Sequence, residues 1–269
     1  MLGSEDITQG VTAMLIRKEQ REALSKARLQ DFEDKMVLHL ACFSPPLFKA
    51  AKEEQIRLAI RFGIAQGDKY GFSLHGPLRL YLELMLLFGS HFDTDPQYPW
   101  ATEVLKDRKS TPQMQRAEFL YERTRHYRAE VAGPGDSYTF KSLRSISALA
   151  RNPLPITWEN LESALLDAMG RVYPQKKHYV GEENLKLLIA EGISKAHSHQ
   201  FTNARSAATL IVLMFSFGHK CHEDPLYPWI GKTLEDRLMT DPEAKARRLE
   251  KKALTWLEYV LASFGEAKA

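Results

Sequence analysis

The fold is indicated by the segment Phe88-Gly-Ser-His-Phe-Asp-Thr-Asp-Pro-Gln-Tyr-Pro-Trp100, because a second version of it occurs later in the chain. The second version is Phe217-Gly-His-Lys-Cys-His-Glu-Asp-Pro-Leu-Tyr-Pro-Trp229, which begins 129 positions further on. Both versions keep Phe-Gly, Asp-Pro and Tyr-Pro-Trp at the same spacing. Self-similarity at one fixed offset is the signature of a repeated structural unit. We therefore expect the chain to be a tandem duplication.

The same offset relates positions on both sides of this segment. The pair Glu53-Glu54 matches Glu182-Glu183, Gly63 matches Gly192, and Pro45 matches Pro174. Apolar residues recur at helical spacing throughout, and no stretch alternates as a half-buried strand would. The sequence therefore predicts an all-α fold made of two tandem helical-bundle units of about 100–110 residues, a usual size for a domain.

The breaks between apolar runs give the expected boundaries. Residues 1–13 are predicted to be a flexible N-terminal extension, 14–132 the first unit, 133–156 a linker with a short helix, and 157–269 the second unit. The linker begins with Gly133-Pro134-Gly135, a strong loop signal. The predicted helices cover residues 14–43, 53–70, 76–88, a short stretch from 99, 112–131, 138–150, 157–172 and 242–264, with Leu47 to Lys52 as a turn and with Thr111 and Thr157 as N-caps.

Composition narrows the functional classes. Apolar residues make up 44% and charged residues 26% of the chain, and the formal charge is only +3. Nucleic acid and anionic membranes select concentrated basic patches, so we expect neither partner. The first residues lack the layout of a signal peptide, and the most apolar run, Ala207 to Phe217, is too short to span a bilayer. We expect a cytoplasmic protein, in which Cys42 and Cys221 are buried, reduced thiols.

Residues shared by the two copies are expected to maintain the fold. Gly63 and Gly192 interrupt helices, where glycine costs about 1 kcal/mol relative to alanine, so a second helix should approach closely there. Asp95-Pro96 and Asp224-Pro225 have turn chemistry. The functional alternative is a carboxylate site, since Asp93 and Asp95 form an Asp-x-Asp pair that the second copy does not reproduce. Trp100 and Trp229 should fix the loops to the core as buried aromatic residues.

The second copy is richer in possible metal ligands. In a hairpin of helices 182–197 and 203–219, His197 and His199 should lie roughly 20–25 Å from the other end at 1.5 Å per residue. The weak candidates at that other end are His178, His219, Cys221 and His222. Their spacing matches no known zinc motif. Gly231-Lys232-Thr233 also lacks the first glycine of a phosphate-binding loop. We expect no metal, no cofactor and no catalytic residue.

Basic residues supply the candidates for partner binding. Those on the closing helix of the first copy are interleaved with acidic residues, which is typical of a solvated face. A docking surface for an acidic protein is the alternative reading. Positions that differ between the copies, such as Arg61/Ala190 and Arg79/Ala208, are free to serve binding. The candidate partner-binding residues are Arg61, Arg79, Arg116 and Arg123.

Residues 14–106 resemble a group of uncharacterised helical bacterial proteins encoded beside type VI secretion and polymorphic-toxin genes. The resemblance lies in Ile60-Arg-Phe-Gly-Ile-Ala65, the apolar run from Tyr81 to Phe88, and the Phe88-to-Ala101 segment. The second copy departs from it at Lys220, Cys221, His222 and Ile230. The resemblance implies no catalytic residues. It implies a protein that works with a secreted toxin or its delivery machinery.

Three functions are therefore expected in order of preference. The first is a non-enzymatic accessory or adaptor protein that binds a toxin or a component of its delivery machinery, for which two helical copies offer a groove between them. The second is an immunity protein that neutralises a cognate toxin. The third is a metal-dependent enzyme. A pI near 8.7 argues against an inhibitor of nucleases, which tends to be acidic.

Overall fold

The structure is a computed structural model that describes residues 26–151 and 155–266 of the chain. Every regular element in this part of the chain is helical, which confirms the all-α prediction. The expected N-terminal extension, 1–13, lies outside the described residues. None of the described helices is long and apolar enough to cross a membrane.

The first half consists of a helix described over residues 26–43 and five further elements. These are α2 (Pro45–Lys69), α3 (His75–Phe88), α4 (Pro99–Lys106), α5 (Gln113–Tyr127) and a π-helical turn η1 (Arg128–Ala132). The connection follows as a short turn η2 (Pro134–Asp136) and α6 (Ser137–Arg151). The second half contains α7 (Leu161–Val172), α8 (Pro174–Val180), α9 (Glu182–Ser198), α10 (Ala204–Phe217), α11 (Pro228–Leu234) and α12 (Pro242–Glu266).

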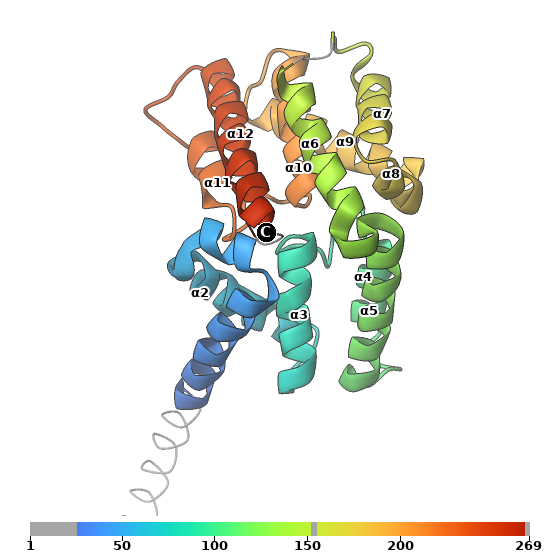
Figure 1. Cartoon of the computed structure of the whole chain (residues 1–269), viewed down its shortest axis with the longest axis vertical. Coiled ribbons are helices and arrows are strands. Elements are labelled where there is room, and N and C mark those ends of the chain that lie inside the picture. The colour runs from blue at the N-terminus through green and yellow to red at the C-terminus, as the bar shows by residue number, and fades with distance from the viewer. Residues whose placement is uncertain (1–25, 152–154, 267–269) are drawn as a thin grey trace, which may run out of the picture.

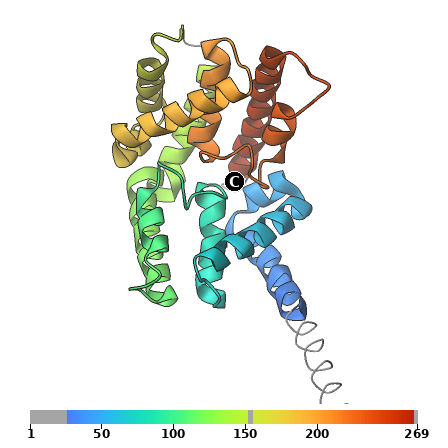
Figure 2. The same ribbon diagram turned by 180° about the vertical axis from the view of Figure 1, so that it is seen from behind.

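The two halves are stacked along the long axis of the molecule (Figure 1). Helices α2 to α5 form the lower part in that view, and α7 to α12 form the upper part. Helix α6 lies on the upper part, next to α12, and Figure 2 shows α9 and α10 on the opposite face of the same part. One hydrophobic core runs through both halves, from Phe32 and Met36 on the first helix to Leu249 on α12.

Packing inside the halves recurs at the offset of 129. A Cβ placed on Gly63 would lie 2.4 Å from Leu82 Cδ2, and one on Gly192 would lie 2.4 Å from the matching Ile211 Cγ1. These distances are far below van der Waals contact, so glycine permits α2 to pack on α3 and α9 to pack on α10. The close approach expected at both glycines is therefore present.

The aromatic cluster behind each repeated loop is the same. Phe88 contacts Tyr98 at 4.6 Å between ring centroids, and Phe217 contacts Tyr227 at 4.4 Å. An edge-on ring from the closing helix completes each cluster, 4.9 Å from Phe88 and 4.7 Å from Phe217. The ring is Tyr127 in the first half and Trp256 in the second. Such pairs add about 0.5–1.5 kcal/mol each beyond area burial.

Several element boundaries differ from the prediction. Residues 47–51, expected to be a turn, are helical and belong to α2, which breaks only at Lys52. Helix α7 begins at Leu161 rather than after Thr157, because residues 158–160 form a turn in which Asn160 Oδ1 accepts a hydrogen bond from the Thr157 N–H. Thr111 is not the N-cap of α5, since its hydroxyl donates to the Asp107 carboxylate and Pro112 occupies the cap position.

Lys52 adopts a backbone conformation for which the matching position in the second half has glycine. Its φ and ψ are 63° and 152°, and Gly181, at the matching position, has 81° and 152°. This region is essentially restricted to glycine and costs about 1–3 kcal/mol for other residues. Glycine at this position would avoid that cost, but its greater flexibility in the unfolded chain would offset about 0.5–1 kcal/mol of the gain in stability.

Lys52→Gly is therefore expected to raise the free energy of unfolding by about 1 kcal/mol in urea titrations, as relief of strain exceeds the entropic loss. The matched control is Glu54→Gly two residues later, at an exposed position inside the regular part of α2. That substitution should lower stability by about 1 kcal/mol. Equal losses in both variants would show that Lys52 is not strained.

Candidate functional site

The two repeated loops cross each other where the halves meet. Asp224 of the second half accepts hydrogen bonds from the Ser90 backbone N–H at 2.7 Å and from the Ser90 hydroxyl at 2.6 Å. In return, Asp95 of the first half accepts a hydrogen bond from the His219 backbone N–H at 2.7 Å. Ser90 and His219 occupy matching positions. Each aspartate therefore joins the opposite half to its own.

Each aspartate also closes the turn of its own loop. Asp95 Oδ1 accepts the Gln97 N–H at 2.8 Å, and Asp224 Oδ1 accepts the Leu226 N–H at 2.8 Å. Both carboxylates are almost fully buried, and burial raises the pKa of each, to about 6 for Asp224. No group of three or more histidine, cysteine or acidic residues in the described part of the chain is arranged to hold a metal ion. The arrangement around the aspartates is that of a turn and a junction.

The glycines at the crossing allow the two backbones to touch. Gly89 has φ +93°, and a Cβ on it would lie 2.3 Å from the carbonyl oxygen of Phe217. Gly218 has φ +99°, and its Cβ would lie 2.9 Å from the carbonyl oxygen of Phe88. Both positions require the conformational freedom of glycine and the absence of a side chain. The crossing is thus specified by Asp95, Asp224 and these two glycines.

The tryptophans that follow the loops differ in burial. Trp100 is buried as expected. Trp229 is only half-buried against the core, so it differs from the prediction. The pyrrole nitrogens of both indoles are buried without a protein hydrogen-bond partner. Asp93, the other member of the Asp-x-Asp pair, accepts the Tyr70 hydroxyl at 2.7 Å. Pro96 and Pro225 lie between the aspartates and the residues that close the turns.

The histidines of the second half are placed differently from the prediction. His199 and His222 have ring centroids 6.4 Å apart, so the expected separation of roughly 20–25 Å is wrong for this pair. The loop after α10 does not extend away from the hairpin. The His222 carbonyl oxygen lies 2.3 Å from where a Cβ on Gly231 would be, which places His222 against α11. His178 is exposed on α8.

The other candidate ligands have protein partners. His219 Nδ1 lies 3.0 Å from the Glu191 carboxylate, and its Nε2 lies 3.0 Å from the Thr94 hydroxyl. Cys221 is buried as expected, and burial raises the pKa of its thiol well above the usual range, which keeps it protonated. Cys42, in contrast, is exposed, because it lies on the solvent-facing side of the first helix. The expectation of two buried thiols is wrong for Cys42.

Arg116 is a buried structural residue, so it is not accessible to a partner protein, contrary to the prediction. It is 3% exposed, and its guanidinium donates to the carbonyl oxygens of Thr111, Leu105 and Tyr70 at 3.1, 3.0 and 2.8 Å. The matching Lys245 donates to Leu234, the counterpart of Leu105, at 2.8 Å. Both basic groups therefore satisfy carbonyl groups at the ends of helices, where backbone acceptors lack intrahelical partners.

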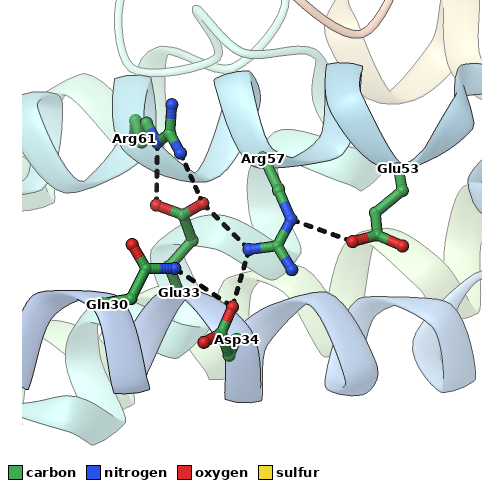
Figure 3. Close-up of polar contacts among 6 residues, drawn as sticks. All are labelled: Gln30, Glu33, Asp34, Glu53, Arg57 and Arg61. Atoms are coloured by element: carbon green, nitrogen blue, oxygen red, sulfur yellow. Dashed lines mark hydrogen bonds and ion pairs between the residues drawn. The ribbon is translucent and has the colours of Figure 1, made fainter.

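Arg61 holds the first helix against α2. Its guanidinium donates to both carboxylate oxygens of Glu33, at 2.8 and 3.0 Å, and Arg57 donates to Glu33 and Asp34 (Figure 3). Glu33 is 5% exposed, and its hydrogen bonds with Arg61 lower its pKa. Arg61 is accessible, but its charge is already paired. Arg123 is exposed on α5.

Arg79 lies in an open groove on the surface of the first half. The groove runs between α3 and α5 and is lined by Gly76, Pro77, Arg79, Leu80, Glu83, Met114, Gln115, Ala117, Glu118 and Tyr121. Met114 and Tyr121, two turns apart on α5, are 56% and 52% exposed, which is high for large apolar side chains. Arg79 forms an ion pair with Glu83 at 3.4 Å, and Glu83 also contacts His39 at 2.7 Å. The groove thus combines apolar side chains with exposed charge.

A second hollow lies beneath α6, between the halves. It has a volume of about 790 Å³ and is lined mainly by apolar side chains of α3, α6, α10 and α12. Lys176 of α8 is the buried charged residue in its wall, and its ammonium donates to the Phe215 carbonyl oxygen at 2.6 Å. Sequence reasoning missed Lys176. The sequence does show that a lysine stands here where the first half has leucine, since Leu47 matches Lys176 at the offset of 129. Both residues line the same cavity.

The groove and the cavity involve matching faces of the two halves. Five groove residues have their counterparts at the offset of 129 in the cavity wall. The pairs are Gly76/Arg205, Arg79/Ala208, Leu80/Thr209, Glu83/Val212 and Tyr121/Glu250. In the second half this face is covered by α6, whereas no helix of the described residues covers it in the first half.

Comparisons of the chain with protein families, with curated proteins and with solved structures find no match.

Proposed function

We propose that the protein is a non-enzymatic binding protein that receives an amphipathic helix of a partner protein in the groove between α3 and α5. One observation carries this proposal. The matching face of the second half is already covered by a helix of the chain itself, α6, while the face in the first half is open. An amphipathic helix that lies in a groove is a recurrent mode of protein recognition.

This comparison rests on the proposal that the halves are tandem copies of one unit. Its support is the recurrence of contacts at one offset: the glycine contacts, the aromatic clusters, the Arg116 and Lys245 bonds, and the reciprocal aspartates. If the units are copies, a surface that accepts a helix in one is suited to accept a helix in the other.

Helix α6 indicates what kind of helix fits. It has 15 residues, and Phe140, Leu143 and Ile146 recur on one side of it and line the cavity. A partner helix of similar length would place its apolar side on Leu80, Met114 and Tyr121. Its polar edges would meet Arg79 on one side of the groove and Glu118 on the other, which favours a helix with acidic and basic residues on opposite edges.

The partner that we propose is a secreted bacterial toxin or a component of its delivery machinery. The support for this class is the sequence resemblance of residues 14–106. An immunity protein would bind the same kind of toxin and block its activity. Rescue of cells that express the toxin separates the two roles, because an adaptor would bind without protecting the cells.

The test is copurification of the full chain with the product of the neighbouring toxin or secretion gene. Met114→Glu combined with Tyr121→Glu is expected to reduce recovery of the partner at least about tenfold, since charge is placed in the apolar part of the groove. Leu238→Glu is the matched control, because Leu238 is 96% exposed and lies outside the groove. Both variants should retain the helical circular dichroism of the wild type. Unchanged recovery with the groove variant would refute the docking site.

A further inference from the structure

The cavity under α6 has the size and lining of a small-molecule site. Its volume of about 790 Å³ lies within the range of roughly 300–1,000 Å³ for ligand pockets. Leu143 and Ile146 of α6 face Val212 of α10 and Leu254 of α12 across it. All four are only half-buried, although they line the space between α6 and the helices beneath it. A mainly apolar lining with a few polar groups is typical of sites that bind small molecules.

Lys176 places one cation in this apolar wall. The side chain is 95% buried, and its ammonium lies 4.4 Å from the centroid of the Phe215 ring. An ammonium group has three donors, and the Phe215 carbonyl takes one. The buried Asp95 carboxylate attracts this ammonium electrostatically, but no hydrogen bond or ion pair to a carboxylate is formed by Lys176 within the described residues. Burial lowers the pKa of this amine to about 8, so that it remains mainly protonated at neutral pH.

The fold does not require an amine at this position. The matching residue in the first half is Leu47, which lines the same cavity and packs against the core. A buried ammonium that no carboxylate contacts directly is costly in an apolar wall. An apolar side chain is therefore sufficient for packing here, whereas a protonated amine with free donors is suited to an anion.

The mouth of the cavity is polar. Arg205 and Glu250 form an ion pair at 3.0 Å, and Arg128 and Asp136 form another at 3.4 Å, with all four residues in the lining. Charged groups at the edge and apolar groups inside are suited to an amphiphile that enters from water. Because these charges are already paired and Lys49 is exposed, Lys176 is the buried cation in the wall that remains to select an anionic head.

We propose that this cavity binds a long-chain fatty acid or a similar aliphatic monocarboxylate, with the hydrocarbon chain beneath α6 and the carboxylate on the ammonium of Lys176. The two free N–H donors and the positive charge would make the charge-assisted hydrogen bonds that a carboxylate accepts. This site is separate from the open groove between α3 and α5, and it does not depend on the proposed docking of a partner helix.

The test compares dodecanoate with dodecanol, which share the chain and differ in the head group, by calorimetric titration into the full-length protein at pH 7. The wild type should bind dodecanoate at least about tenfold more tightly than dodecanol, because only the carboxylate can accept charge-assisted hydrogen bonds from Lys176. Lys176→Met should lose this preference and bind both probes alike. Lys49→Met is the matched control, because Lys49 also lines the cavity but is exposed, and it should keep the preference.

A second variant tests the apolar part of the site independently of Lys176. Val212→Trp fills the space beneath α6 and should abolish binding of both probes, while circular dichroism reports whether the helical fold persists. Three results would overturn the proposal: no binding of either probe to the wild type, equal binding of the two probes to the wild type, or a carboxylate preference that survives in Lys176→Met. If Lys176→Met does not fold, retained binding in folded Val212→Trp would also overturn it.

Discussion

Replacing Gly89 by alanine is expected to destabilise the protein by about 4 kcal/mol or more, the largest effect of a glycine-to-alanine change at the glycines of the described residues. The alanine Cβ would lie 2.3 Å from a backbone carbonyl oxygen of the other half, at a φ of +93°. The unfavourable φ costs about 1–3 kcal/mol, and overpacking against a backbone costs a similar amount. Urea unfolding should show this loss as a lower midpoint.

The matched control for this substitution is Gly76→Ala. A Cβ on Gly76 has no neighbour within 4 Å, and the residue lies in the first turn of α3. Alanine should leave stability unchanged there or raise it by up to about 1 kcal/mol. If Gly89→Ala is too unstable to purify, Gly218→Ala, with its larger separation of 2.9 Å, should give a smaller measurable loss. Equal stability of the Gly76 and Gly89 variants would contradict the crossing.

Asp224→Ala is expected to cost about 3 kcal/mol or more. It leaves the backbone N–H groups of Ser90 and Leu226 buried without their acceptor, and the Ser90 hydroxyl as well. Each orphaned donor costs about 1–3 kcal/mol. Asp236→Ala is the control, because the partners of Asp236, the Leu238 N–H at 3.0 Å and the Arg248 guanidinium at 3.0 Å, both lie in its own half. Its loss should stay below about 1 kcal/mol.

The ionisation of Asp224 also makes the stability of the protein depend on pH, and stability falls as the pH rises. Burial raises its pKa in the folded protein to about 6, above the value near 3.9 of an unfolded chain. The folded state then binds the proton more tightly, so this group lowers stability as the pH rises from about 4 to about 6. Asp224→Asn should remove that decline from the profile of unfolding free energy against pH, and a profile identical to the wild type would refute it.

How much of this could be read from the sequence depends on whether a contact involves a side chain or the backbone. Gly63 and Gly192 were interpretable because a repeated glycine inside a helix has few explanations other than close approach. The repeated Asp-Pro pairs correctly indicated turns. Their second role, the bond to the other half, could not be predicted, because the donors are backbone N–H groups that any residue supplies.

Arg116 illustrates the same limit in the opposite direction. Among the alternating charges of its helix it resembled a solvated residue, yet it is buried because three carbonyl groups surround it. Every residue has a backbone carbonyl group, so the sequence does not show where three of them converge on one side chain. The histidines were misplaced for a different reason, since helix geometry predicts the ends of a hairpin but not the path of the loop that follows it. Lys176 became recognisable only when the structure showed that it and Leu47 line the same cavity.

The reciprocal bonds between Asp95 and Asp224 have a consequence for how such a molecule can change. A contact in which each side offers the other the same groups is the isologous contact of two-fold dimers. Within one chain the contact forms at any protein concentration, and a change on one side need not be repeated on the other. One polypeptide can therefore keep leucine and lysine at matching positions in the lining of the same cavity, and one open and one covered face, which identical subunits related by exact symmetry could not do.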